Sequence, residues 1–344
     1  MTAHYLFFVN VSYSFSILRP LQEVIRKRKG KTAWFLQDLE ASHLKDDELL
    51  LENVKAVKAF NPEVVFVPGN WVPDFFPGLK VEVFHGFHVY KRPKQRGHFR
   101  IRGFFDLYCT HGPSTTLPFK ELARHHGCFE VVETGWPKLD PLFAEPDEGP
   151  GNTRPVVFLS STFTPALSCA DKLFETVQGI SSGGQWKWLV NFHPLMDASV
   201  VAKYKSIQNE NLEYVETDNI IPLLKKADVM VSDTSSIVTE FLVTQKPVVT
   251  FRNRKPGPHL VDVRHTEELA NAVSLALSKP DRLMAQIRAY ADQEHPYYDG
   301  CSSQRVLEAA DRLAAKGLDH LKSKPMNLVR RLKTRKKLGY YRWK

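Results

Sequence analysis

The amino-acid sequence predicts an α/β protein with two doubly wound domains, each a parallel sheet covered by helices on both faces. Two features of the 344 residues support this prediction. Short apolar runs, typical of buried strands, alternate with amphipathic helical segments in both halves of the chain. A turn-rich segment, residues 145–155, separates the halves, and the chain length fits two domains of roughly 100–200 residues.

Strand-like and helical segments follow one another along the whole chain. Strands are predicted at residues 5–9, 32–36, 63–67, 81–84, 106–109, 129–132, 155–159, 186–192, 212–215, 229–231 and 247–251. Helices are predicted at residues 18–29, 47–60, 117–126, 171–180, 200–207, 221–226, 266–277, 280–293 and 302–316. Leu50, Val54 and Val57 show the helical spacing, and Gly30 fits a C-cap. The predicted domains are residues 1–145 and 155–318, followed by a tail over residues 319–344.

The basic charge of the chain is concentrated in this tail. The formal net charge is +9, but residues 322–344 hold ten Lys and Arg and no acidic residue. The remainder has 37 basic against 38 acidic residues, a net charge of −1, so no specific nucleic-acid partner is expected. The tail also contains Leu328, Val329, Leu332, Tyr340, Tyr341 and Trp343. Basic residues with interfacial aromatics fit an anionic membrane surface, whereas a solvated tail or nonspecific RNA contact is the alternative.

Cysteine usage and hydropathy favour a cytoplasmic chain, held peripherally at the inner face of the plasma membrane by its tail. The four cysteines form no CxxC pair, which predicts reduced thiols and no zinc site. Residues 5–9 are too short for a signal-peptide core, and no run approaches the ~18 apolar residues of a spanning helix. The sequence has no clustered pair of aspartates that would suggest an obligatory metal. No cofactor is expected, although assistance by Mg²⁺ is left open.

Residues 227–240 combine a buried strand, a polar turn and a helix predicted to start near Ser235. The polar turn contains Ser232, Asp233, Thr234, Ser235 and Ser236. Hydroxyl and carboxylate oxygens cap the first backbone N–H groups of a helix, and the remaining N–H groups attract anions. The turn has more polar groups than one cap requires, which indicates an anion site; an ordinary capped turn is the alternative.

Several other polar residues directly follow predicted strands. They include His85-Gly86, His111-Gly112, Gly135, Ser160-Ser161 and His193-Pro194. Ligands of doubly wound sheets bind outside the carboxyl ends of the strands, where glycine lets the backbone approach closely. These positions, together with residues 232–236, are therefore the candidate functional residues.

The motifs at these positions resemble those of a known family. They are Phe84-His85-Gly86, Thr134–Asp140, Phe192-His193-Pro194, Val231–Glu240 with Lys246-Pro247-Val248, and Asp299–Arg305. In this order they are similar to the CDP-glycerol:polyol-phosphate glycerophosphotransferases, which include teichoic-acid polymerases and primases and are related to capsule-type transferases. The resemblance covers roughly residues 80–310. It implies a GT-B fold, in which two Rossmann-like domains face a cleft, the first on the acceptor side and the second binding the nucleotide donor.

The resemblance also implies an activity: transfer of a polyol phosphate from a CDP-activated donor to a hydroxyl of a lipid-linked or polymeric, anionic cell-envelope glycan. Phe84 stands where the family usually has Trp, and Thr234 and Thr239 stand where it has aromatic residues. The chain also lacks the family's long N-terminal membrane-targeting extension. These departures leave the donor and the acceptor open.

Two histidines are the candidate catalytic residues. The family equivalent of His85 takes the proton of the acceptor hydroxyl, and a neutral imidazole near pH 7 suits this role. His193 is expected to donate a hydrogen bond to the donor diphosphate or to protonate the leaving phosphate. A structural histidine at a strand end is the alternative for each, and Asp140 is a candidate to orient His85.

The remaining candidates bind the two substrates. Residues 232–236 are expected to hold the donor diphosphate, and Ser302, Ser303 and Arg305 could form a second half of this site. Glu240 is expected to accept hydrogen bonds from the ribose, with a solvated helix residue as the alternative. On the acceptor side, Lys91 and Arg92 belong to a basic run that could attract a polyanion or could be a solvated loop.

Two other functions remain as alternatives. A GT-B glycosyltransferase or a UDP-sugar 2-epimerase-like enzyme would use the same fold with a sugar nucleotide. An epimerase needs carboxylates beside the substrate, and the sequence offers no convincing set beside His85. A non-enzymatic adaptor that binds the membrane through residues 322–344 and takes up no nucleotide is the third possibility.

Overall fold

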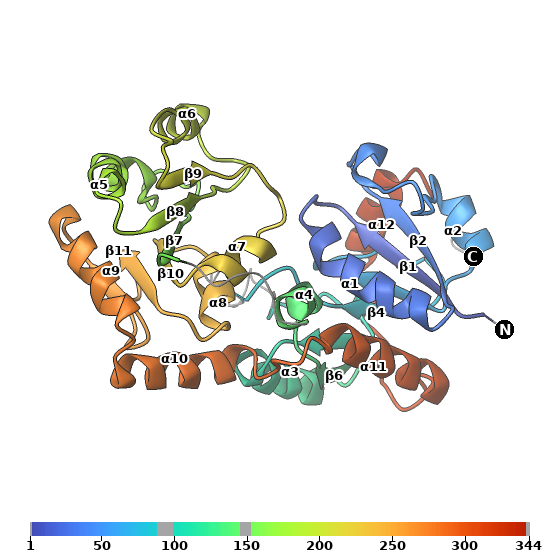
Figure 1. Ribbon diagram of the computed structural model, residues 1–344. Coiled ribbons are helices and arrows are strands. Elements are labelled where there is room, and N and C mark those ends of the chain that lie inside the picture. Colours follow the sequence, from blue (N-terminus) through green and yellow to red (C-terminus); the bar gives the residue numbers. More distant parts are fainter. Residues whose placement is uncertain (1, 88–98, 145–152, 342–344) are drawn as a thin grey trace. The chain divides into compact units, whose positions relative to one another are not determined.

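The computed structural model describes residues 2–87, 99–144 and 153–341. The chain divides into two compact units, each with its own parallel sheet (Figure 1). Unit 1 contains Met1–Ala144 and His295–Lys344, and unit 2 contains Glu145–Glu294. The predicted α/β class with two doubly wound sheets is confirmed.

Unit 1 is built on a six-stranded parallel sheet with the order β2-β1-β3-β4-β5-β6. Its strands are β1 (His4–Val9), β2 (Lys31–Leu36), β3 (Val64–Val67), β4 (Leu79–Glu82), β5 (Leu107–Thr110) and β6 (Glu130–Glu133). Its helices are α1 (Ser14–Lys27), α2 (Val54–Phe60), α3 (Pro113–His126), α4 (Asp140–Phe143), α11 (Ser302–Lys316), α12 (Leu328–Lys337) and the 3-10 helices η1 (Ala41–His43) and η2 (Pro137–Leu139). Because β2 and β3 lie on opposite sides of β1, the strand order reverses between β1 and β3, the expected place for a ligand.

Unit 2 has a second parallel sheet with the order β12-β11-β10-β7-β8-β9. Its strands are β7 (Val156–Leu159), β8 (Lys187–Val190), β9 (Leu212–Tyr214), β10 (Val229–Ser232), β11 (Val248–Phe251) and β12 (Val261–Val263). Its helices are α5 (Ala170–Ser182), α6 (Ala198–Ser206), α7 (Ile221–Lys226), α8 (Ile237–Leu242), α9 (Leu269–Leu277), α10 (Asp281–Glu294) and the 3-10 helix η3 (Thr266–Glu268). Here the strand order reverses between β7 and β10.

Both sheets are buried because their strands are nearly continuous apolar runs. All four residues of β3, β7 and β11 are buried, as expected for parallel strands with helices on both faces. Each unit has its own apolar core, which includes Trp188 and Tyr204 in unit 2 and Phe8 and Phe119 in unit 1. Each sheet therefore gives its own unit a rigid carboxyl edge, from which loops can present side chains.

Some predicted boundaries differ from the observed ones. Helix α2 starts at Val54 and not at residue 47, because the Asn53 side chain accepts the Ala56 N–H as an N-cap and Leu50 pairs with Trp34 in a parallel bridge. The short edge strand β12 was not predicted. A three-residue edge strand leaves too short a pattern to distinguish it from a loop.

The second predicted domain, residues 155–318, was wrong at its carboxyl end. Unit 2 ends at Glu294, and α11 belongs to unit 1, where it packs against α1. The buried stripe of α11 includes Val306, Ala310 and Leu313. An amphipathic helix is placed by the surface that buries its apolar stripe, and here that surface is on unit 1. The tail, residues 319–344, is also part of unit 1 and contains α12, whose buried residues are Thr334 and Arg335.

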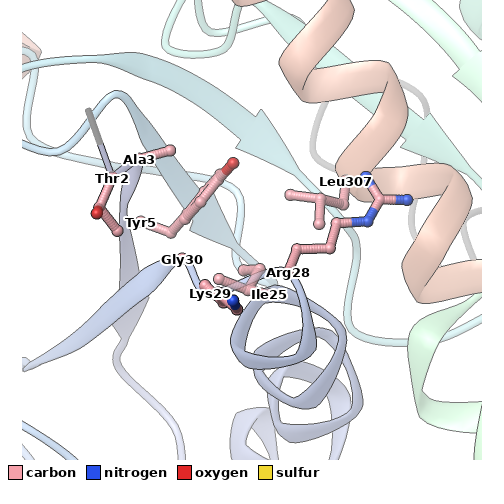
Figure 2. Close-up of a pocket in the computed structure, with 8 residues that line it drawn as sticks. All are labelled: Thr2, Ala3, Tyr5, Ile25, Arg28, Lys29, Gly30 and Leu307. Atoms are coloured by element: carbon pink, nitrogen blue, oxygen red, sulfur yellow. The ribbon is translucent and has the colours of Figure 1, made fainter.

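A pocket of about 340 Å³ lies in unit 1 at the amino ends of β1 and β2 (Figure 2). Tyr5 and Arg28 line it beside Leu307 of α11. Tyr5 Oη donates a hydrogen bond to Asp311 Oδ1 at 2.8 Å, and Arg28 pairs with Glu308 at 3.0 Å. Ligands of doubly wound sheets bind at the opposite, carboxyl ends of the strands. This pocket therefore lies between α11 and the amino ends of the strands and is not part of the candidate site.

Candidate functional site

In unit 2, Asp233 connects the loops at the carboxyl edge of the sheet, where the strand order reverses between β7 and β10. It follows β10 directly and is fully buried. Its carboxylate accepts hydrogen bonds from Ser161 Oγ at 2.5 Å, from the Thr162 N–H at 3.1 Å and from the Cys169 N–H at 3.0 Å. The Asn253 side chain donates to the Asp233 carbonyl at 3.0 Å. The loops after β7, β10 and β11 are therefore held by one residue.

These contacts change the interpretation of Asp233. Sequence reasoning placed its carboxylate on the donor diphosphate. In the structure, both carboxylate oxygens face backbone N–H groups of the loop after β7. Burial raises the pKa of the Asp233 carboxyl, and the hydrogen bond from Ser161 acts in the opposite direction. Asp233 is thus a positioning residue for the loops.

The hydroxyl residues around Asp233 occupy different environments. Ser232, the last residue of β10, is fully buried, and its Oγ has no hydrogen-bond partner within the described part of the chain. Thr234 Oγ accepts the Arg254 N–H at 3.1 Å. Ser235 and Ser236 are partly exposed and precede α8, which starts at Ile237 and not near Ser235 as predicted. The Ser236 side chain makes no cap hydrogen bond, so its hydroxyl does not stabilise the start of α8.

A basic loop beside these serines was missed by sequence reasoning. Arg254 and Lys255 are exposed and follow β11. Asn253 fixes this loop, since it donates to Asp233 O and its Oδ1 accepts the Lys255 N–H at 2.9 Å. The signal was present in the sequence as Arg252-Asn253-Arg254-Lys255 directly after the predicted strand 247–251. Two cations therefore lie on the loop that bonds to Thr234.

His193 lies on the loop after β8, the strand next to β7. Its ring is exposed and packs against the Phe163 ring, with centroids 4.6 Å apart. His193 Nδ1 accepts the Leu195 N–H at 3.1 Å. A ring nitrogen that accepts carries no proton, so the neutral ring has its proton on Nε2. His193 is thereby prepared to donate a hydrogen bond from Nε2.

Glu240 lies in α8 with only 6% of its surface exposed. This burial excludes the alternative of a solvated helix residue. Lys246, which the family motif also includes, donates from Nζ to the carbonyls of Leu224, Lys225 and Ala227 and so caps the carboxyl end of α7. The lysine therefore has a structural role.

In unit 1, His85 lies at the carboxyl edge of the sheet, on the segment after β4. His85 Nδ1 lies 3.3 Å from Pro68 O, directly after β3, and its ring lies 6.1 Å from that of Tyr13, which follows β1. A carbonyl oxygen can only accept, so Nδ1 carries the proton and the lone pair of the neutral ring is on Nε2. His85 is partly exposed and lies beside the reversal point between β1 and β3.

The residue before His85 has an unusual backbone. Phe84 is buried and has φ = 57°, in the left-handed region that bulky residues rarely adopt. Its ring packs against Phe119, with centroids 5.1 Å apart, and its carbonyl accepts from Trp136 Nε1 at 3.4 Å. Strain of this kind persists only where the surroundings enforce it, and it occurs often at functional sites. The fixed Phe84 sets the direction in which the chain presents His85.

Asp140 does not contact His85 in the way sequence reasoning suggested. Its carboxylate accepts the N–H groups of Ser302 at 2.8 Å and Ser303 at 2.6 Å. The first N–H groups of α11 are therefore capped by a carboxylate of the same unit, which corrects their interpretation as phosphate ligands. Arg305 is also engaged within unit 1, where it pairs with Asp299 and lies over the Tyr297 ring. Thus Ser302, Ser303 and Arg305 belong to unit 1 and not to unit 2, which contains residues 232–236.

The remaining predicted residues, Lys91 and Arg92, lie outside the described residues. Within residues 2–87, 99–144 and 153–341, no three His, Cys, Asp or Glu side chains come together as metal ligands. The helices in these ranges also include none that is both long and apolar enough to cross a bilayer.

Comparisons with known proteins agree on the fold and differ on the activity. A family model described as UDP-N-acetylglucosamine 2-epimerase matches residues 166–311. The teichoic acid glycerol-phosphate primase of Bacillus subtilis (strain 168) is 22% identical over 207 residues, which cover 54% of this chain and 52% of the primase. The chain thus spans about half the length of this curated relative, to which it is weakly homologous.

Two solved structures resemble nearly the whole chain. The S. aureus MnaA–UDP co-structure has a TM-score of 0.66 at 13% identity, covering 94% of this chain and 99% of that one. The wall teichoic acid polymerase TagF has a TM-score of 0.64 at 12% identity, covering 92% of this chain and 90% of that one. The fold is GT-B. Both predicted Rossmann-like halves of the GT-B chain are present as the two six-stranded parallel sheets.

One buried histidine gives the GT-B chain a pH dependence that can be tested. His295 is fully buried, and its Nε2 accepts the Trp136 N–H at 3.0 Å. Burial lowers its pKa to about 4, because the charged ring is poorly solvated and Nε2 cannot accept once protonated. The unfolded chain binds the proton near pH 6.5, so stability is complete above that pH and is lost as the pH falls towards 4. The loss should reach about 3 kcal/mol.

Urea unfolding at a series of pH values between 7 and 4 would measure this effect. His295→Gln offers an amide oxygen to the Trp136 N–H and does not titrate in this range. The variant should therefore lose less stability than the wild-type protein over the same interval. Parallel stability curves for the two proteins would contradict the assignment.

Proposed function

We propose that the chain is a GT-B transferase that moves a polyol phosphate, such as glycerophosphate, from a CDP-activated donor to a hydroxyl of a cell-envelope glycan. Unit 2 binds the donor, and His85 of unit 1 activates the acceptor hydroxyl. The weak homology to a glycerol-phosphate primase and the fold shared with TagF support this choice of chemistry.

The observation that carries the proposal is the opposite state of two histidines. Nδ1 of His85 donates to a carbonyl, which leaves the lone pair on Nε2, the requirement for a general base. Nδ1 of His193 accepts from an N–H, which places the proton on Nε2, the requirement for a hydrogen-bond donor or acid. One ring is set to take a proton and the other to give one, as transfer to a hydroxyl requires.

The loops at the carboxyl edge of the unit 2 sheet have a chemistry that fits a diphosphate. Ser235 and Ser236 provide hydroxyls, and Arg254 and Lys255 provide positive charge on the adjoining loop. The Asp233 carboxylate is bound to backbone N–H groups and so is buried away from a bound anion, and the Asp197 carboxylate accepts the Ser199 N–H as the N-cap of α6. Phosphate binding is favoured where donors and cations converge without a competing carboxylate.

The proposed step balances without a redox partner. His85 Nε2 removes the proton from the acceptor hydroxyl while the hydroxyl oxygen attacks the donor's β-phosphate, the one that carries the polyol. The bond between this phosphorus and the bridging oxygen breaks, and CMP leaves with the electron pair. The hydrogen bond that His193 Nε2 donates stabilises the charge that develops on the leaving phosphate. The product is a phosphodiester between the polyol and the glycan.

Epimerisation of a UDP-sugar is the second candidate, because the epimerase family model covers residues 166–311. A carboxylate that removes a proton from a sugar carbon must reach the substrate. Asp140 and Asp233, two of the carboxylates at the motif positions, are both bound to backbone N–H groups of their own unit. This arrangement favours transfer over epimerisation, and equally over a sugar-nucleotide glycosyltransferase that needs a carboxylate base.

A donor screen by thermal unfolding tests the proposed function. CDP-glycerol, CDP-ribitol, UDP-N-acetylglucosamine and CMP would each be added to the full chain. A ligand at 100 times its dissociation constant stabilises the protein by about 2.7 kcal/mol, which corresponds to a rise in Tm of several degrees. We expect a CDP-polyol to give the largest rise. Incubation with a hydroxyl acceptor should then release CMP.

A variant with Arg254→Ser and Lys255→Ser should bind the CDP-polyol at least tenfold more weakly, since it loses two charge-assisted contacts. The control is Arg282→Ser with Arg288→Ser, two exposed arginines on α10 of the same unit. A larger rise in Tm with UDP-N-acetylglucosamine than with either CDP-polyol would favour the epimerase. If no nucleotide raises the Tm, the result would favour the non-enzymatic adaptor.

A further inference from the structure

We propose that α12 and the residues beside it form a binding site for an anionic lipid surface. Exposed apolar side chains on α12 would enter the headgroup region, and the arginines and lysines around them would pair with lipid phosphates. The proposal concerns unit 1 alone and does not depend on the transfer activity.

The carboxyl end of α12 is fixed to the body of unit 1. Arg335 is 4% exposed and pairs with Asp74 at 2.6 Å, and its guanidinium lies over the Phe75 ring. Lys337 pairs with Asp38 at 2.8 Å. The Tyr340 ring stacks on Phe75, with centroids 4.6 Å apart. Tyr340 is therefore a docking residue and not the interfacial aromatic expected from the sequence.

The exposed part of α12 carries apolar side chains that the described part of unit 1 leaves uncovered. Leu328, Val329 and Leu332 are 50%, 66% and 51% exposed, and Met326 just before the helix is 64% exposed. Positions 328, 329 and 332 share one face of a helix, since residues three and four apart are neighbours. Tyr341 is 65% exposed beyond the helix end, and Trp343 lies outside the described residues.

Positive charge surrounds this apolar ridge, which is formed by Met326, Leu328, Val329 and Leu332. Lys333 and Lys336 are exposed, and neither they nor Arg330 forms an ion pair with a carboxylate in the described part of the chain. Arg330 instead lies near another arginine: burial lowers its pKa first, and the charge of Arg100 lowers it further. The charge of Arg330 in turn lowers the pKa of Arg102 after burial, while Glu82 opposes this. An anion placed here would relieve the repulsion among the arginines.

The combination selects a lipid surface over RNA. The phosphates of RNA and those of a membrane would both pair with the cations. The four exposed aliphatic side chains, however, would gain no apolar contact from a nucleic-acid backbone. A headgroup region accepts both, with apolar side chains at the acyl boundary and cations among the phosphates. The contacts of Arg335, Lys337 and Tyr340 fix α12 on unit 1, so the ridge is presented on a folded surface.

The test measures co-sedimentation of the full chain with vesicles of phosphatidylcholine alone and of phosphatidylcholine with phosphatidylglycerol. We expect binding to the anionic vesicles that weakens as salt is added. Each basic residue near the surface contributes roughly a fivefold factor at low salt. Arg330→Ser with Lys333→Ser and Lys336→Ser should thus weaken binding roughly a hundredfold. Leu328→Ser with Val329→Ser and Leu332→Ser should lower it by at least a similar factor.

Matched controls place equivalent changes elsewhere. Leu117→Ser and Leu275→Ser replace exposed leucines, and Arg282→Ser with Arg288→Ser replaces exposed arginines. All these variants should keep the wild-type Tm, because each altered side chain is at least partly exposed. Anionic-vesicle binding that survives the triple serine change of the ridge would overturn the proposal. So would binding to an RNA oligonucleotide that is tighter than vesicle binding and unaffected by that change.

Discussion

Replacing His85 with alanine should lower the rate of the proposed polyol-phosphate transfer by a factor of about 10² to 10⁴, the usual contribution of a general base. The donor should bind with nearly unchanged affinity, because the diphosphate contacts assigned here come from unit 2. The fold should be preserved, since His85 is partly exposed. CMP release under single-turnover conditions would measure the rate, and a thermal shift with the donor would measure binding.

Chemical rescue gives this experiment its sharpest form. Imidazole added to His85→Ala should restore part of the transfer rate if the missing group is a base, and should do nothing if His85 only shapes the chain after Phe84. His125→Ala is the control, because this ring lies at the carboxyl end of α3 in the same unit and has no proposed role. Transfer within tenfold of the wild-type rate in the His85 variant would remove the residue from the mechanism.

Replacing Asp233 with alanine should destabilise unit 2 by roughly 3–5 kcal/mol. The change leaves Ser161 Oγ and the Thr162 and Cys169 N–H groups without their buried acceptor, and each such loss costs about 1–3 kcal/mol. For a unit of this size the corresponding fall in Tm is on the order of 10 °C. Calorimetry of the full chain would resolve the transition of unit 2.

Asp233→Asn separates a positioning role from direct contact with the donor. The amide retains one acceptor oxygen but directs an NH₂ group at backbone N–H groups, so it should lie between wild type and Asp233→Ala in stability. Donor binding should decline in the same order, because the loops after β7 and β10 lose their common anchor. Asp218→Ala, an exposed aspartate of unit 2, should change stability by no more than about 0.5 kcal/mol. A stable Asp233→Ala protein that fails to bind the donor would indicate direct contact.

The positions of the candidate residues could be predicted because they depend on local patterns. Apolar runs located the strands, and the carboxyl-end rule then selected His85, His193 and residues 232–236 without any knowledge of contacts. Arg254 and Lys255 could have been found in the same way, since they also follow a strand. No helix was predicted in the tail, where a solvated segment was the alternative, and the structure has α12 there.

What could not be predicted depends on contacts between distant segments. A serine pair at a helix start looks the same whether its N–H groups meet a phosphate or a carboxylate, and here Asp140 meets them from 162 positions away. The role of Asp233 was hidden for a similar reason, because the loop that buries it comes from 72 positions earlier. The domain boundary was misplaced because an amphipathic helix such as α11 does not reveal which surface it covers.

The return of the chain to unit 1 at His295 has a consequence for how the protein is made. All residues of unit 2 are synthesised before α11 and α12, so unit 2 can fold without waiting for the helices that complete unit 1. The amino-terminal sheet must wait, with the surface of α1 that α11 later covers still open to water and to other chains. Chaperones that bind apolar surfaces would find their longest-lived target there, in the segment that was translated first.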